Sequence, residues 1–495
     1  MNKKIFKRMI TLLLTIIMLT AFMPQAVYAI AGGLYPDRYP EPVDIPDAYD
    51  PNAGQTTPDK PGEVITETPV NSAISKIKYK IANLSEAQKS DVKEIDLLLL
   101  YSEETIAEIA SKTVSGGEIS INQTGISELL SMAAAIKSAA EKTVSDSGIE
   151  IVREISADIK FKTSESKKIT ITIGHSAANM TADNIRVETP HYAVSIPKAA
   201  IAEGTKSGNL VITIEKVDPT AFKAFLSLDG KSAATQYIAA KKEEKYKVTV
   251  TSQTKENIKY SFEPASGDVN YQAVFRSDGT AVGGKYNPVT KKIDTRIRFS
   301  DTYTLKENKK DFTDITAKSK AMQDAIKVLA SKGIINGTSA TTFNPDGAIT
   351  RAEIAALVVR TLSKLDENAD AKFADVKKAD WYCGAVGSAK SYGIINGMSA
   401  TTFEPLTKIK KEQIIAIAAR TLRSEMKWKT PSDKEKYLKK FTDRKDLPNW
   451  GIDDFALASM ADLIVLRTDG KFNPTDTMTR GDAAIVLYRL FEKIW

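Results

Sequence analysis

An internal repeat in the last third of the chain constrains its fold more than any other feature. The segment GIINGTSATTFNPDGAITRAE begins at Gly333 and returns as GIINGMSATTFEPLTKIKKEQ at Gly393, sixty residues later. The two segments share twelve of twenty-one positions, and the four residues at their ends change from TRAE to KKEQ. Self-similarity at such a period is typical of supersecondary units that stack on one another.

A third and more divergent copy follows, so we expect three modules over residues 311–370, 371–436 and 437–495. Each module opens with an aromatic-x-Asp motif, continues into an amphipathic helix, and ends a loop with F-x-P before a second helix. The motif starts are Phe312, Phe373 and Phe441, and the F-x-P motifs start at Phe343, Phe403 and Phe472. The third copy reads DLIVLRTDGKFNP where the others contain GIING. The pattern predicts an all-α architecture for this region.

The residues that open each second helix form a capping signal. Thr350 precedes the helix and Glu353 lies three residues later, which is the pattern of a capping box. Thr479 and Asp482 repeat it in the third module. Capping explains the threonines and the acidic residues, but it does not explain the arginine between them.

Positive charge at these helix starts points to an anion site. Arg351, Arg480 and the pair Lys410–Lys411 face the positive end of a helix dipole, which costs about 0.3–1 kcal/mol. Unpaired first-turn amides together with a guanidinium would bind a carboxylate or a phosphate. Alternatively, Arg351 pairs with an acidic residue of a neighbouring module. Because all three modules carry the charge, we favour the anion site, although lysine is not equivalent to arginine at a bidentate site.

These motifs, three times in order over residues 311–495, resemble S-layer homology modules. The resemblance implies a three-pronged pseudo-trimer at the cell surface that attaches the protein non-covalently to a secondary cell-wall polymer linked to peptidoglycan. It also implies that the ligand is a pyruvylated polysaccharide, held in grooves between the prongs. The carboxylate of a pyruvate ketal is the kind of anion that the helix starts predict.

The resemblance can be carried over to individual residues. Arg351 and Arg480 match the arginine of the family's TRAE motif, and Lys411 takes that place in the second module. Trp381 and Trp450 match a tryptophan early in the first helix, which either stacks on a sugar face or belongs to the core. The first module has Ala321 there instead. We therefore expect fewer than three working sites.

The N-terminal segment predicts export. A basic start, an apolar run over residues 10–22 and the sequence VYA predict a signal peptide over residues 1–29. Residues 30–70 are rich in proline, which favours an extended linker, with a proline-rich partner ligand as the alternative. No further stretch is apolar enough for a membrane span, so we expect a secreted, cell-wall protein without membrane contact after cleavage.

The middle of the chain predicts two further units, which makes the whole a multidomain α+β protein. Residues 71–157 suggest a small α/β unit, with helices over 91–114 and 126–144 and strands over 118–122 and 149–154. Residues 158–310 alternate with period two in eight or more short segments, which predicts a β-sandwich. In the last of these segments we expect Ile293, Thr295, Ile297 and Phe299 to share one face.

Charge and composition exclude several functions. The chain has a formal charge of +7, and without residues 1–29 the 65 basic and 62 acidic residues leave +3, too little for nucleic-acid binding. The single cysteine, Cys383, excludes an internal disulfide and fits a small core residue. We find no spacing of residues that predicts a metal site or a cofactor.

The region between the linker and the repeats shows no catalytic motif. Its two histidines, His175 and His191, lie outside any metal-binding or nucleophile pattern, and all four tryptophans lie in the repeats. We therefore expect a non-catalytic displayed half. The alternatives are a component of an S-layer lattice, with other surface-layer proteins as partners, and an anchored enzyme acting on glycans or peptidoglycan.

Overall fold

A computed structural model describes residue 75 and residues 110–146, 156–165, 167–217, 243–252, 254 and 256–495. These residues belong to one compact unit, Glu67–Trp495. The signal peptide, the proline-rich linker, the strand expected over 149–154 and the helix expected up to residue 109 lie outside them. Within the described ranges, no helix combines the length and the apolar composition needed to cross a membrane.

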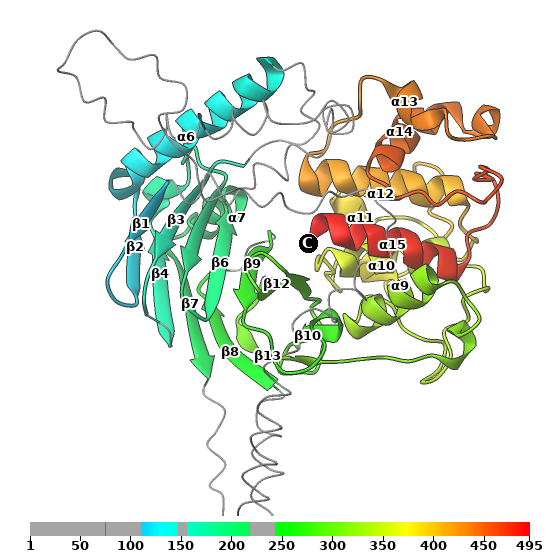
Figure 1. The fold of residues 1–495 in the computed structure, drawn as a ribbon. Coiled ribbons are helices and arrows are strands. Elements are labelled where there is room, and N and C mark those ends of the chain that lie inside the picture. The colour runs from blue at the N-terminus through cyan, green and yellow to red at the C-terminus, as the bar shows by residue number, and fades with distance from the viewer. Residues whose placement is uncertain are drawn as a thin grey trace, which may run out of the picture. The chain divides into compact units, whose positions relative to one another are not determined.

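The N-terminal part contains two mixed β-sheets (Figure 1). In spatial order, the first sheet contains β1 (Ser111–Thr113), β3 (Asp158–Lys162), β5 (Asn184–Glu188), β6 (Tyr192–Pro197), β9 (Ile258–Phe262), β12 (Lys292–Ile297) and β11 (Lys285–Asn287). The second contains β10 (Gln272–Phe275), β13 (Asp301–Glu307), β8 (Glu243–Val250), β7 (Leu210–Val217), β4 (Lys168–Ile173) and β2 (Glu118–Ile121). Their helices are α6 (Gln123–Asp146) and α7 (Lys198–Gly204).

Period-two alternation places one face of each sheet in a shared core. In β4, Ile169, Ile171 and Ile173 are fully buried while the threonines between them face outward. Rings from both sheets meet in this core, where Tyr246 of β8 stacks on Phe262 of β9 with centroids 4.1 Å apart. The sandwich predicted from the sequence is thus confirmed, and so is the helix expected over 126–144.

Three expectations for this part need correction. β1 and β2 pair in parallel with β3 and β4, so the expected boundary at residue 157 does not separate two units. Strands of three and four residues cannot bury a core alone, and their open backbone groups extend the larger sheets instead. β1 also replaces the end of the helix expected up to residue 114. Phe299 lies beyond β12 and is 39% exposed, because the chain turns there toward β13.

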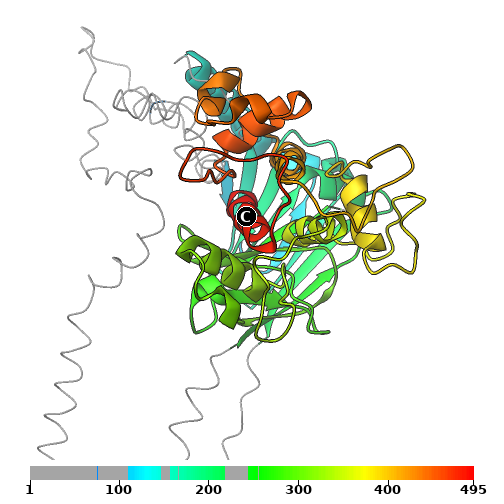
Figure 2. The ribbon, with the colours of Figure 1, turned by 90° about the vertical axis from the view of Figure 1, so that its right-hand side faces the viewer.

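The C-terminal part is helical, as expected. Its helices are α9 (Lys320–Ser331), α10 (Arg351–Thr361), α11 (Cys383–Ser391), α12 (Lys411–Met426), α13 (Lys434–Leu438), α14 (Ile452–Met460) and α15 (Arg480–Ile494). The first helices of the three modules, α9, α11 and α14, point in three directions around the second helices α10, α12 and α15 (Figure 2). The boundary expected between residues 436 and 437 lies inside helix α13, so the third module begins before this helix or after it.

A ring of backbone hydrogen bonds closes the three modules on one another. The Ile349 amide donates to the Met478 carbonyl (3.1 Å), the Met478 amide donates to Ile409 (2.9 Å), and the Ile409 amide donates to Ile349 (3.0 Å). Each module therefore contacts both others through the residues just before its second helix. This cyclic pairing gives the pseudo-trimer that the resemblance predicted.

The aromatic-x-Asp motif shapes the loop of its own module. The Asp375 carboxylate accepts hydrogen bonds from the amides of Phe403 (2.9 Å) and Glu404 (2.7 Å), and Asp314 and Asp443 make the same pair of contacts in the other modules. Phe373 also packs on Phe403 with ring centroids 5.6 Å apart. The motif thus fixes the F-x-P turn, which carries the groups that line the candidate site.

Donors of the sheet region cap the C-terminal ends of helices in the repeats. Arg296 donates to the carbonyl of Ile494 (2.6 Å), Asn257 to Leu362 (2.8 Å) and Asn308 to Ser331 (2.7 Å). The last carbonyls of a helix have no partner within the helix and carry the negative end of its dipole. The sheet region therefore satisfies three helix ends of the repeats.

Candidate functional site

The Thr350–Glu353 capping box forms as the sequence predicts, whereas at Thr479 the contact found is the one made by the threonine side chain. Thr350 Oγ1 accepts from the Glu353 amide (3.2 Å), and Glu353 Oε2 accepts from the Thr350 amide (2.7 Å). Thr479 Oγ1 accepts from the amide of Asp482 (3.1 Å). In the second module Gln413 Oε1 still accepts from the Lys410 amide (3.1 Å), although the capping threonine is missing.

The first-turn amides are occupied, which differs from the expectation of free donors. The Arg351 amide donates to the Thr407 carbonyl (3.0 Å) and the Ala352 amide to the Pro405 carbonyl (2.9 Å), both in the next module. Equivalent bonds join the amides of Lys411 and Arg480 to carbonyls of the third and first modules. These amides hold the modules together, so they cannot form an anion nest.

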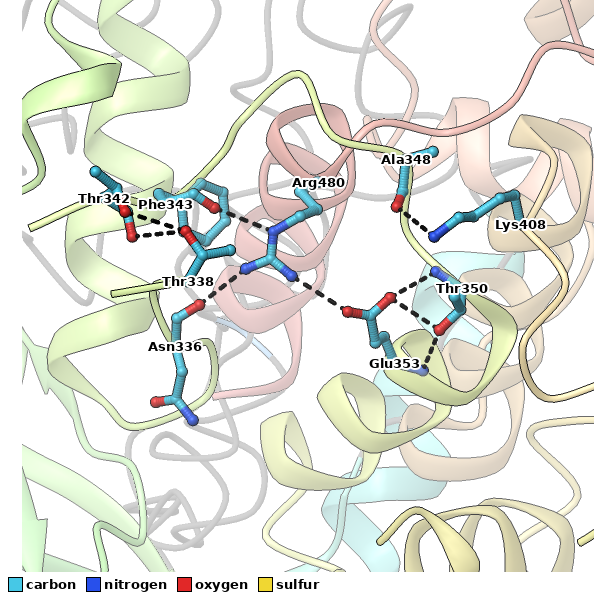
Figure 3. Close-up of polar contacts among 9 residues, drawn as sticks. All are labelled: Asn336, Thr338, Thr342, Phe343, Ala348, Thr350, Glu353, Lys408 and Arg480. Atoms are coloured by element: carbon cyan, nitrogen blue, oxygen red, sulfur yellow. Dashed lines mark hydrogen bonds and ion pairs between the residues drawn. The ribbon is translucent and has the colours of Figure 1, made fainter. Parts of the chain in front are cut away.

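The arginine side chains in the first turn also reach into the next module. Arg351 donates to the carbonyls of Phe403 (2.8 Å) and Asn396 (3.2 Å) and lies over the Phe403 ring, 4.7 Å from its centroid. Arg480 makes the same contacts with Phe343 and Asn336 of the first module (Figure 3).

Lys411 makes only the weaker version of this contact. Its Nζ lies 3.5 Å from the Phe472 carbonyl and 3.8 Å from Asp476 Oδ2.

Two of these junctions are hollowed into grooves. The module 1 groove has a volume of about 380 Å³ and is lined by the loop of module 1, helix α10, Arg480 and Trp381. The module 2 groove, of about 220 Å³, is lined by the loop of module 2, helix α12, Arg351 and Trp450. Each groove thus joins residues of all three modules. Trp381 and Trp450 lie just before α11 and α14, not within these helices as expected from the sequence. They are 64% and 58% exposed, so their indole faces are available to a ligand.

Each groove holds a second arginine that the sequence reasoning missed. Arg360 of α10 lines the module 1 groove, and Arg420 of α12 lines the module 2 groove. In the part of the chain that the structure describes, neither guanidinium has a hydrogen bond or an ion pair. Burial lowers the pKa of Arg360 below its usual value. A half-buried cation without a partner favours the binding of an anion.

A positional signal could have revealed these arginines. Arg360 and Arg420 lie nine residues after Arg351 and Lys411, within the otherwise apolar runs IAALVVRTL and IIAIAARTL. A repeated charge in an apolar stretch requires a specific environment. The pattern alone does not show, however, that the environment is a groove between modules.

Comparison with known proteins identifies the repeats. The family model of the S-layer homology domain matches residues 311–355, 372–415 and 440–484. The chain carries three S-layer homology domains. Such domains mark proteins of the bacterial cell wall and S-layer, so the chain is a cell-surface protein.

Curated relatives share a limited part of their length with this chain. It is 31% identical over 237 residues to an amylopullulanase of Thermoanaerobacterium thermosulfurigenes, covering 48% of this chain and 12% of that protein. It is 30% identical over 187 residues to the surface-layer 125 kDa protein of Lysinibacillus sphaericus, covering 37% and 15%. It is 29% identical over 177 residues to an S-layer protein of Bacillus thuringiensis subsp. finitimus, covering 35% and 20%.

The third junction between the S-layer homology domains differs from the other two in three residues and in the pairing of its conserved arginine. By the cyclic order it would combine Lys411, the loop of the third domain and Ala321, which occupies the place of the tryptophan. Arg489, the counterpart of Arg360, donates to the carbonyl of Asp462 (2.8 Å) and lies 3.3 Å from its carboxylate. Leu466 replaces the glycine of the loop. Among the described residues, this junction has no unpaired arginine and no tryptophan.

The remaining candidates contact neighbouring groups of the protein or are buried. His175 Nδ1 lies 2.9 Å from the Thr205 carbonyl, and His191 Nδ1 lies 2.9 Å from Glu263 Oε1. Cys383 is buried at 6% exposure in α11, as expected for a core residue. Among the described residues, no cluster of His, Cys, Asp and Glu has the arrangement of a metal site.

Proposed function

We propose that the S-layer homology domains anchor this protein non-covalently to the Gram-positive cell wall by binding an anionic, pyruvylated secondary polymer linked to peptidoglycan. The observation that carries this proposal is the unpaired guanidinium in each groove, Arg360 in one and Arg420 in the other, beside an exposed tryptophan. A carboxylate on a sugar needs a cation, and the sugar ring itself packs well on an indole face.

Each groove offers these two contacts at once. In the module 2 groove, Arg420 supplies the free cation and Trp450 the exposed aromatic face, while Arg351 holds the loop between them. Binding would need little reorganisation, because the guanidinium of Arg351 is already fixed by two carbonyls. The polymer therefore meets a preformed site, which favours affinity.

The sheet region is proposed to be a displayed half without catalytic activity. This proposal rests on the sequence, which shows no catalytic motif there, and is supported by the contacts of both histidines with neighbouring groups of the protein. The relatives include S-layer proteins and an amylopullulanase. Incubation of the chain with wall and plant glycans tests the enzyme alternative, since release of reducing ends would contradict a non-catalytic role.

Co-sedimentation with purified peptidoglycan sacculi tests the anchor. The chain without residues 1–29 would be mixed with sacculi that retain the secondary polymer and with sacculi from which it has been removed. We expect binding only to the first, and loss of binding in the double variant Arg360→Ala/Arg420→Ala. Arg467→Ala, which removes an exposed arginine outside the grooves, is the matched control. Equal binding of both variants would contradict the proposal.

A further inference from the structure

The two grooves are lined by residues at equivalent positions, but one of these positions is charged in only one groove. Glu353 lines the module 1 groove, and Gln413 takes its place in the module 2 groove. Both residues accept a hydrogen bond from the N-cap amide of their helix, at 2.7 and 3.1 Å. The capping function is therefore kept in both grooves, whereas the negative charge is kept in only one.

Glu353 also reaches the arginine of its groove. Its Oε1 lies 3.4 Å from Nη1 of Arg480, and its Oε2 accepts from Thr350 (Figure 3). In the module 2 groove, the lining residue that corresponds to Arg480 is Arg351, and the residue at position 413 is a neutral amide whose Nε2 lies 3.8 Å from Met398 Sδ. Glu353 thus already supplies Arg480 with the carboxylate that a ligand would bring.

The formal charge of the two grooves differs as a result. The charged residues that line the module 1 groove are Arg360, Arg480 and Glu353, which sum to +1. Those that line the module 2 groove are Arg351 and Arg420, which sum to +2. Glu404, where module 1 has Asn344, interacts electrostatically with Arg351 and so reduces this difference, but it is exposed to solvent and does not line the groove.

We propose that the residue at this position sets the affinity of each groove for a carboxylate, so that the module 2 groove is the tighter anion site and the module 1 groove the weaker one. This inference rests on the proposed function, because it assumes that both grooves bind a carboxylate-bearing sugar. A like charge beside the ligand and competition for Arg480 both weaken binding in the module 1 groove. The expected difference in Kd is about tenfold.

Each groove contains its own tryptophan, which allows a site-resolved test. The probe is a methyl glycoside that carries a 4,6-linked pyruvate ketal, and the readout is the indole ¹⁵N–¹H signals of the full chain. The shift of Trp381 reports the Kd of the module 1 groove, and that of Trp450 reports the module 2 groove. Trp428 and Trp495, which line neither groove, report that the protein stays folded.

Reciprocal substitutions at positions 353 and 413 test whether this one side chain sets the Kd of each groove. Glu353→Gln is expected to lower the Kd at Trp381 about tenfold and to leave Trp450 unchanged, while Gln413→Glu is expected to raise the Kd at Trp450. Both substitutions keep a capping side chain that this protein already uses. The methyl ester of the probe, which is neutral, should respond weakly to either change.

Two other outcomes are distinguishable. Equal Kd values at both tryptophans that neither variant changes would overturn this inference and leave the anchor intact. If the probe shifts neither tryptophan in a folded protein, the proposed function fails and the inference fails with it.

Discussion

At the scale of single residues, Arg351 shows how an unfavourable position becomes useful. The residue is 7% exposed in the first turn of its helix, where the dipole disfavours a cation. Two carbonyls, from Phe403 and Asn396, and the ring of Phe403 offset this cost. The sequence revealed the unfavourable charge but not its partners, because these lie 52 and 45 residues away and belong to another module.

The two kinds of groove arginine should therefore respond differently to substitution. Arg351→Ala is expected to lower the free energy of unfolding by about 1.5–3 kcal/mol, because it leaves buried carbonyls without a charged donor. Arg420→Ala should change it by less than about 0.5 kcal/mol, since among the described residues its side chain has no hydrogen bond or ion pair to lose, and yet abolish binding in its groove. Urea unfolding followed by circular dichroism, with sacculus binding in parallel, checks both. Equal destabilisation by the two variants would contradict the distinction.

Lys332 predicts a dependence of stability on pH. The side chain is 2% exposed, donates to the Gln272 carbonyl, and burial lowers its pKa to about 7. Glu492 and Asp268 counteract this shift only in part. Between pH 7 and 9 the unfolded chain thus holds a proton at this amine that the folded chain has partly released. The contribution of this amine to the free energy of unfolding is therefore expected to rise with pH in this window.

Lys332 is expected to raise the free energy of unfolding by about 2 kcal/mol between pH 7 and 9. Lys332→Met removes the titrating group and keeps an apolar stem of similar length, so the variant should show a flatter profile. The measurement is the free energy of unfolding of both proteins in urea at pH 7, 8 and 9. Parallel profiles would show that the amine does not titrate in this range.

At the scale of elements, the aspartate of each aromatic-x-Asp motif acts as the cap of a loop. Burial tends to raise the pKa of Asp375, but hydrogen bonds from the amides of Phe403 and Glu404 outweigh it and hold the pKa below its usual range. The carboxylate therefore stabilises the loop above the pKa of the unfolded chain, and this contribution is lost as the pH falls through the folded pKa.

Asp375→Asn should lower the free energy of unfolding at pH 7 by about 1.5–3 kcal/mol, because an amide keeps the shape but loses the charge and one acceptor. Asp346→Asn, at an exposed carboxylate that pairs with Lys318, is the control and should have little effect. Chemical unfolding of the three proteins compares them directly. A similar loss in both variants would argue against a specific capping role.

An element could be predicted from the sequence when the residues that determine it lie close together in the chain. Helix α10 and strand β4 follow from capping residues and period-two alternation within a few positions, and both were predicted. The pairing of β1 and β2 with the larger sheets depends on contacts with strands about fifty residues away, so the boundary at residue 157 was wrong. Trp381 was expected early in its helix but lies just before α11, and its position in a groove could not be predicted because the other walls come from different modules.

At the scale of the whole molecule, the cyclic closure produces three junctions from three similar modules, but divergence has changed one of them. Two junctions combine an unpaired arginine with an exposed tryptophan. The third has Ala321 instead of tryptophan, Lys411 instead of arginine, and Arg489 paired with Asp462. This pairing neutralises the cation that the other junctions leave free. The ring thus keeps its third junction for closure while losing the groups that would hold a ligand.

This difference predicts a stoichiometry of two ligands per chain. Calorimetric titration with the pyruvylated methyl glycoside should give two sites in the full chain and none in Arg360→Ala/Arg420→Ala. Arg489→Ala is the matched control: it removes the equivalent arginine at the third junction, where the side chain already has a partner, and should leave two sites. Three sites in the unmodified chain, or a site lost with Arg489, would show that the paired arginine still serves a ligand. Two sites in the unmodified chain and in Arg489→Ala would mean that free guanidinium groups, rather than the number of modules, determine how many polymer segments one molecule can hold.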